Sequence, residues 1–117
     1  MRDAEIVTKC KMYIRSNLNR ALTIAMIAKA VNYNQDYLIH VFKKVMGITL
    51  MEYIREEKME LATMYLLEGR SVIEVAELLG YSKNGFTKAY KAVKGVNPSS
   101  VYKQSKKERT IWQEIVC

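Results

Sequence analysis

Apolar residues recur along most of this chain at intervals of three and four, the period of amphipathic helices. The first such stretch, residues 3–18, carries Ile6, Cys10, Tyr13, Ile14 and Leu18 on one face. We find no run in which apolar and polar residues alternate with the period of two that marks a strand. The pattern therefore predicts an all-α fold.

Residues that stop or cap helices divide the first half of the chain. A second helix over residues 22–31 should end at Asn32, because asparagine adopts the left-handed conformation more readily than most residues. Asn34 can cap a third helix that runs to Met46, and Gly47 should end it.

Two capping boxes, each a Ser or Thr followed three residues later by Glu, begin the next two helices. Thr49 should open a long helix that lasts until Gly69, about 20 residues or roughly 30 Å. Ser71 should open a short helix that Gly80 ends.

The last third contains two more helix starts. Ser82 or Asn84 can cap a helix that ends before Gly95, and Pro98 behind Asn97 marks the first turn of a further helix. The expected organisation is a first helix-turn-helix subdomain over residues 1–48, a linker helix over 49–69, a second helix-turn-helix subdomain over 70–105, and a C-terminal tail over 106–117. A helical extension is the open alternative for this tail.

The two subdomains repeat one plan. Ala76 and Gly80 form the Ala-x-x-x-Gly turn of a helix-turn-helix, in which a small residue lets the helices cross closely. Ala28 and Asn32 occupy the same places earlier in the chain. A spacer of about 30 Å nearly matches one turn of B-DNA, roughly 34 Å, so one chain could enter two successive major grooves.

Composition narrows the class of protein. The chain has 117 residues, of which 50% are hydrophobic and 26% charged, values typical of one globular domain and not of a large enzyme or a disordered chain. There is neither an apolar run of about 20 residues nor a signal peptide, so we expect no membrane partner and a cytoplasmic location. Cys10 and Cys117 lack metal-site spacing with His40 and are interpreted as free thiols, which leaves no metal site and no cofactor.

Positive charge gathers in the last third. Residues 83–117 hold eight basic and two acidic residues, a net charge of +6, whereas residues 1–82 hold eleven basic and ten acidic residues, a net charge of +1. This asymmetry indicates a polyanionic partner for the C-terminal part, with a merely solvated basic face as the open alternative.

Specific residues in order along the chain resemble the AraC/XylS family of bacterial transcription regulators over about residues 4–103. They are Ile73 to Tyr81 (IEVAELLGY), then Phe86, Thr87, Lys88, Tyr90, Lys91, Gly95 and Pro98, and upstream Tyr33, Tyr37, Leu38, Phe42, Lys43, Lys44, Gly47, Tyr53, Ile54, Arg55, Lys58, Met59 and Ala62. The resemblance implies a seven-helix DNA-binding domain with two lobes. The chain departs from that family by one residue fewer between Tyr81 and Phe86, and at His40 and Ile39, where a polar residue and an arginine are frequent.

The outer faces of the two recognition helices hold the candidate DNA contacts. Expected to reach base edges are Gln35, Asp36, Ile39 and His40 in the first subdomain and Lys83, Asn84, Thr87 and Lys88 in the second. Expected to touch phosphates are Lys43, Lys44, Lys91 and Lys94. Two alternatives remain open: Asp36 only stabilises a helix N-terminus, and each lysine is only solvated.

Other prominent residues receive structural roles. Helical spacing assigns the core to Phe86, Tyr90, Tyr37, Phe42 and the seven methionines. The acidic face of the long helix, with Glu52, Glu56, Glu57 and Glu60, should repel DNA, with Arg55 or Lys58 as the possible exception.

Two functions remain after these steps. The first is a sequence-specific double-stranded DNA-binding domain, the output part of a larger regulator joined to a sensor or receiver domain, with RNA polymerase as a further possible partner. The second is a helical protein adaptor that uses the acidic stretch of the long helix and, in the tail, Ile111, Trp112 and Ile115. We expect no enzyme, because the sequence shows no catalytic set and no phosphate-binding loop.

Overall fold

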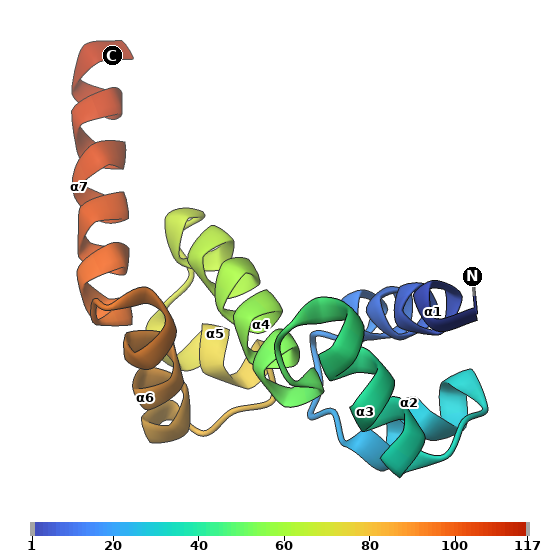
Figure 1. The fold of residues 1–117 in the computed structure, drawn as a ribbon. Helices are drawn as coiled ribbons and strands as arrows, with labels where there is room; N and C mark the ends of the chain where they lie inside the picture. The colour runs from blue at the N-terminus through green and yellow to red at the C-terminus, as the bar shows by residue number, and fades with distance from the viewer. Residues whose placement is uncertain (1, 117) are drawn as a thin grey trace. The chain divides into compact units, whose positions relative to one another are not determined.

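The computed structural model describes residues 2–116, without the side chains of residues 112, 114 and 116. This part of the chain forms seven helices and no strand (Figure 1), so the all-α prediction is confirmed. The helices are α1 (Arg2–Ser16), α2 (Ile24–Val31), α3 (Gln35–Met46), α4 (Leu50–Leu67), α5 (Val72–Leu78), α6 (Lys83–Lys94) and α7 (Pro98–Val116).

The chain divides into two compact units between Glu57 and Lys58. In the first unit, α1 packs against both α2 and α3. Its core includes the fully buried side chains of Ile14, Ile27 and Phe42, and the first half of α4 adds Leu50, Tyr53 and Ile54.

The second unit has its own core around Met59, Leu66 and Val75. Phe86 and Tyr90 of α6 lie within it, as predicted. Helices α5, α6 and α7 pack against one another, and the second half of α4 lines the same core.

The local signals for helix ends are confirmed. Asn32 caps α2 with a φ of +64°, and Gly47 and Gly95 end α3 and α6 with positive φ. Ser82, and not Asn84, is the N-cap of α6, because its Oγ accepts the Gly85 N–H at 3.1 Å.

Several sequence-based assignments to the core were wrong. Met12, Met51 and Met64 are 46% to 65% exposed, because they lie on the outer faces of α1 and α4. Tyr37 is 39% exposed and stacks on Tyr33, with ring centroids 6.0 Å apart. Met59 is fully buried, as expected.

The last helix is longer than the second helix-turn-helix requires. α7 continues without a break through residues 106–116, so the helical extension of the tail is the alternative that the structure supports. Cys10 is buried and free, in agreement with its interpretation as a thiol, whereas Cys117 lies outside the described residues. None of the helices in residues 2–116 is both long and apolar enough to cross a membrane.

Candidate nucleic-acid interface

The helix-turn-helix of the first unit consists of α2, a tight turn and α3. Asn32 leaves α2 in the left-handed conformation, and the Tyr33 N–H then donates to the Ala28 carbonyl at 3.0 Å. Ala28 is buried at this crossing, where its small side chain lets the two helices come close.

A side-chain cap fixes the start of α3. Asn34 Oδ1 accepts the N–H of Asp36 at 2.8 Å and that of Tyr37 at 3.3 Å. The first turn of α3 therefore begins at Gln35, and both Gln35 and Asp36 are exposed.

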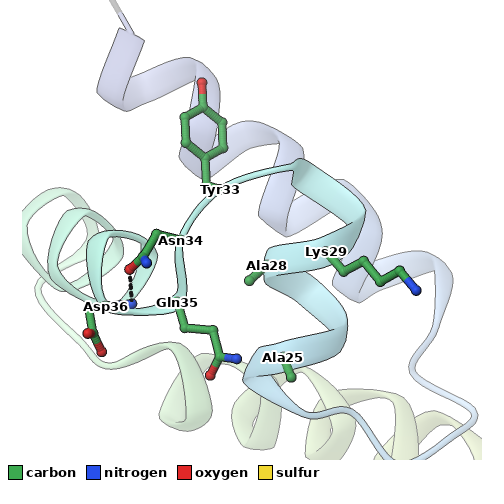
Figure 2. Close-up of a pocket in the computed structure, with 7 residues that line it drawn as sticks. All are labelled: Ala25, Ala28, Lys29, Tyr33, Asn34, Gln35 and Asp36. Carbon is green, nitrogen blue, oxygen red and sulfur yellow. Dashed lines mark hydrogen bonds between the residues drawn. The ribbon is translucent and has the colours of Figure 1, made fainter.

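A cavity of about 550 Å³ lies between α2 and this first turn (Figure 2). It is lined by Ala25, Ala28, Lys29, Tyr33, Asn34, Gln35 and Asp36. In Figure 2 the Gln35 side chain extends between the two helices, and the short side chains of Ala25 and Ala28 leave that space open. The cavity thus gives access to the first turn of α3.

The four predicted base-contacting residues of the first unit share one exposed face. Gln35 and Ile39 are one turn apart, as are Asp36 and His40, and all four are exposed. Asp36 is in the first turn, where a carboxylate also stabilises the positive end of the helix dipole. Both roles proposed for Asp36 remain compatible with its position.

The predicted phosphate contacts of the first unit lie in the last turn of α3. Lys43 and Lys44 are exposed. Lys44 Nζ is 3.6 Å from a carboxylate oxygen of Asp3 in α1. Because the Lys44 side chain is 66% exposed, this ion pair contributes little energy and does not prevent a phosphate contact.

The second unit repeats the same turn. Gly80 has a φ of +79°, and the Tyr81 N–H donates to the carbonyl of buried Ala76 at 2.9 Å. Lys58 of α4 reaches this turn from the core: its Nζ donates to the Leu79 carbonyl at 2.7 Å. Only 4% of Lys58 is exposed, so the suggestion that it faces DNA was wrong. Burial lowers the pKa of Lys58 below its usual value.

The predicted base-contacting residues of the second unit lie at the start of α6. Lys83, Asn84 and Lys88 are exposed, and Thr87 is half-buried. Thr87 Oγ1 donates to the Lys83 carbonyl at 3.0 Å, so its oxygen remains available as an acceptor.

A second cavity, of about 510 Å³, adjoins this part of α6. Its wall contains Lys83, Asn84 and Thr87, together with the first residues of α5 and of α7: Ser71, Val72, Ile73, Asn97, Pro98, Ser99 and Tyr102. The sequence predicted where α7 starts but gave no sign that this start lies beside the exposed face of α6, since that proximity depends on tertiary packing.

The two remaining lysines of α6 differ in their surroundings. Lys91 is exposed. Lys94 forms an ion pair with Glu60 of α4, and its side chain is only 24% exposed. No local sequence pattern indicates this pairing, because the two residues are 34 positions apart.

The described residues hold no group of three His, Cys, Asp or Glu side chains arranged for a metal ion. Both units expose polar side chains from the start of a helix that follows a tight turn, and both carry lysines in the last turn of that helix. This combination defines a helix-turn-helix protein of the nucleic-acid-binding class.

Comparison with known families agrees with this geometry. A family model described as a helix-turn-helix domain matches residues 27–104, which is most of the chain. The chain belongs to the AraC-type helix-turn-helix family, whose members are DNA-binding domains of transcription regulators.

Individual relatives show the extent of the similarity. The chain is 33% identical over 96 residues to an uncharacterised helix-turn-helix transcriptional regulator, YtdP of Bacillus subtilis, covering 80% of this chain and 12% of YtdP. The C-terminal domain of AraT, a response regulator from Geobacillus stearothermophilus, is 28% identical with a TM-score of 0.80, covering 85% of this chain and 84% of that domain.

A third neighbour shares the fold at low identity. The DNA-binding domain of AdpA, a global transcriptional factor solved in complex with a target DNA, has a TM-score of 0.80 at 15% identity, and covers 89% of this chain and 96% of that chain. The chain spans between 12% and 36% of the length of the first three curated relatives that it matches.

Proposed function

We propose that α3 and α6 are both recognition helices, which enter successive major grooves of one DNA duplex. One observation carries this proposal: the two helix-turn-helix units correspond residue by residue with a shift of 48 positions. The turn bond from Tyr33 to Ala28 recurs from Tyr81 to Ala76 at nearly the same length, 3.0 Å against 2.9 Å.

The same shift relates the candidate base contacts. Adding 48 to 35, 36, 39 and 40 gives 83, 84, 87 and 88, so the two sets occupy equivalent places on equivalent helices. We infer that Gln35, Asp36, Ile39 and His40 read one half-site and Lys83, Asn84, Thr87 and Lys88 the other. Glutamine pairs well with adenine, aspartate accepts from cytosine, lysine donates to guanine, and an aliphatic side chain meets a thymine methyl group.

We further infer that Lys43, Lys44, Lys91 and Lys94 contact phosphates, which fixes the register of the protein without reading sequence. Lys94 must then exchange its ion pair with Glu60 for a phosphate. Because Glu60 already neutralises Lys94 in the protein without DNA, Lys94 should contribute the least of the four lysines to binding.

The place of this domain in the cell is also a proposal. The AraT domain belongs to a response regulator, and YtdP is much longer than this chain, so we infer that the chain serves as the output domain of a larger cytoplasmic regulator. A sensor or receiver domain would control it, and RNA polymerase would be the partner through which it acts on transcription. Its role is binding and not catalysis.

Selection from random DNA duplexes tests the main proposal. We expect enrichment of two half-sites about one helical turn, roughly 10 base pairs, apart, and protection of both in footprinting. The double variant T87A/K88A should lose protection of one half-site and keep the other. Lys103→Ala, an exposed lysine of α7 outside both recognition helices, is the matched control and should leave both half-sites protected. Selection of a single short element would contradict the use of two recognition helices.

A second candidate function rests on the exposed apolar side chains of α7. Ile111 is 46% exposed and Ile115 is 71% exposed, at a spacing of one helical turn. A protein adaptor would use such a surface. Two results would favour this function over DNA binding. The domain would show no DNA affinity even at low salt, and it would stably capture a protein partner, with capture abolished by the substitution I111D.

A further inference from the structure

The two units bury equivalent positions of their first helix, with one difference in chemistry. In the first unit the fully or nearly buried positions of α1 are Ile6, Val7, Cys10 and Ile14; in the second unit those of α4 are Lys58, Met59, Ala62 and Leu66, each 52 positions further on. The second unit therefore places a lysine where the first unit places an isoleucine. A buried ammonium group is costly unless it gains a strong interaction in return.

Lys58 finds that interaction at the turn of the second helix-turn-helix. Its Nζ donates to the Leu79 carbonyl at 2.7 Å and lies 5.2 Å from the centre of the Tyr81 ring. Leu79 is the C-cap of α5, and its own N–H bonds back to the Val75 carbonyl at 3.1 Å. One side chain thus holds the end of α5 and the first residue after the turn glycine.

The Leu79 carbonyl belongs to the class of groups that a helix end leaves without an intrahelical partner. Leu79 is fully buried, so a carbonyl left without a partner here is unfavourable. A cation at this end also interacts favourably with the helix dipole. Isoleucine at the equivalent position of the first unit offers no donor, and in that turn Asn32 takes the left-handed conformation that Gly80 takes in the second.

We infer that Lys58 is a positioning residue that fixes the turn between α5 and α6, and so sets how α6 presents Lys83, Asn84 and Thr87 to DNA. The inference rests on the proposed function of α6. Lys58 acts through the backbone at Leu79 and the ring of Tyr81, not by touching DNA. The two units then differ: the second holds its recognition helix by a charged contact from the core, and the first by packing.

The substitution Lys58→Met tests this role, because methionine has a similar length and no donor. The matched control is Ile6→Met at the equivalent position of the first unit. Both variants are measured at 10 °C after circular dichroism has shown that they are folded. A purely structural loss would lower the melting temperature without changing which base pairs the folded protein prefers.

Two readouts follow. Amide hydrogen exchange at Gly80 and Tyr81 should become on the order of tenfold faster in K58M. Loss of a buried hydrogen bond destabilises the closed turn by an amount that corresponds to about this factor in the opening equilibrium. Exchange at Asn32 and Tyr33 should not change. Base discrimination at the half-site read by α6 should fall by a similar factor, while discrimination at the other half-site and the salt dependence of binding stay as in the wild type.

Several results would overturn the inference. One is unchanged exchange at Gly80 and Tyr81, and another is an equal loss of discrimination at both half-sites. If the wild-type domain selects no DNA, the proposed function fails, but hydrogen exchange still decides whether Lys58 holds the turn.

If K58M does not fold, the wild type supplies the test. The Nζ protons of Lys58 should exchange with water at least tenfold more slowly than those of exposed Lys103. Equal exchange rates would show that Lys58 does not hold the turn.

Discussion

The guanidinium group of Arg109 lies directly against Gly69, where an added Cβ atom would stand 1.9 Å from Nη1. Arg109 Nη2 donates to the Leu67 carbonyl at 2.9 Å, and Ser105 Oγ donates to the same carbonyl at 2.7 Å. α4 has no basic residue in its own last turn, so α7 supplies both donors to its C-terminal end. Two features of the structure require glycine at position 69: its φ of +95°, and the space beside its Cα atom that the Arg109 side chain fills.

Gly69→Ala should lower the free energy of unfolding by about 1–3 kcal/mol, from left-handed strain of roughly 1–2 kcal/mol and the loss of the Arg109 hydrogen bond. Gly95→Ala is the matched control, because Gly95 has a φ of +76° with open space around it and should show the strain alone. Urea denaturation measures both. In an R109A background the excess cost of G69A over G95A should disappear; an equal cost of the two substitutions in the wild type would show that Arg109 moves aside freely.

Two buried tyrosines should respond in opposite ways to loss of the hydroxyl group. The Tyr53 hydroxyl makes no hydrogen bond of good geometry among the described residues. Burial raises its pKa, with a smaller raising effect of nearby Glu57 and an opposing effect of Arg15. The Tyr90 hydroxyl lies 2.6 Å from Thr63 Oγ1, which itself donates to the Met59 carbonyl. Tyr53→Phe should therefore be neutral or stabilising, whereas Tyr90→Phe should cost about 0.5–1.5 kcal/mol.

Thermal and urea unfolding of both variants check this pair. The two phenylalanine substitutions remove the same atom, so the comparison isolates the hydrogen bond. A destabilised Y53F would mean that the Tyr53 hydroxyl has a partner in solution, such as the nearby Glu57 or Arg15 side chain or a bound water.

Local signals in the sequence predicted the helices and their ends. The burial and exposure of individual side chains that were predicted wrongly depend on long-range contacts. Asn32, Gly47 and Ser82 act within one turn of their own position, so a single sequence is enough to recognise them. Lys58 and Tyr37 were misassigned because a helical period says which residues share a face but not what that face meets. Lysine is among the residues least often buried, and the contact that accompanies its burial here, with the Leu79 carbonyl, lies 21 positions away in the sequence.

The candidate interface divides in the same way. The exposure of Gln35, Asp36, Lys83 and Asn84 follows from their place at a helix start after a tight turn. The ion pair of Lys94 with Glu60 and the cavity beside the start of α7 depend on how distant elements pack, and no local pattern indicates them. Contact with bases and phosphates stays a prediction.

Cys10 should make stability depend on pH above 9. Burial raises the pKa of its thiol from 9.0 to about 11, with a smaller opposing effect of a backbone hydrogen bond. The contribution is fully present below pH 9 and is lost as the pH rises towards 11, because the unfolded chain ionises first. About two pKa units correspond to a loss of about 3 kcal/mol at most.

Cys10→Ala removes this dependence. Buried Lys58 has the opposite effect in alkaline solution, since its lowered pKa makes the folded state release a proton earlier than the unfolded chain. Lys58 is present in both wild type and C10A, so its contribution is removed when the free energy of unfolding of C10A is subtracted from that of the wild type. This difference should decrease between pH 8.5 and pH 11. A difference that stays constant over this range would show that the thiol ionises equally in both states.

The lysines of α6 should separate base reading from phosphate binding. Lys88 lies on the face equivalent to that of His40, and Lys91 is in the last turn of the helix. Lys88→Ala should reduce discrimination at one base pair of its half-site by about 1–3 kcal/mol. Lys91→Ala should weaken binding to all sequences alike and reduce the slope of log affinity against log salt concentration by about 1.

Fluorescence anisotropy titrations between 50 and 200 mM salt, on the selected site and on single-base variants of it, distinguish the two effects. Lys94→Ala provides a graded control. Because Lys94 is already paired with Glu60, K94A should reduce the slope of log affinity against log salt concentration less than K91A does. Glu60→Gln frees Lys94 and should strengthen binding to every sequence. If K88A lowered affinity uniformly and K91A changed the preferred base, the residues of α6 that read bases would lie about one helical turn closer to its C-terminus than the repeat of 48 positions assigns.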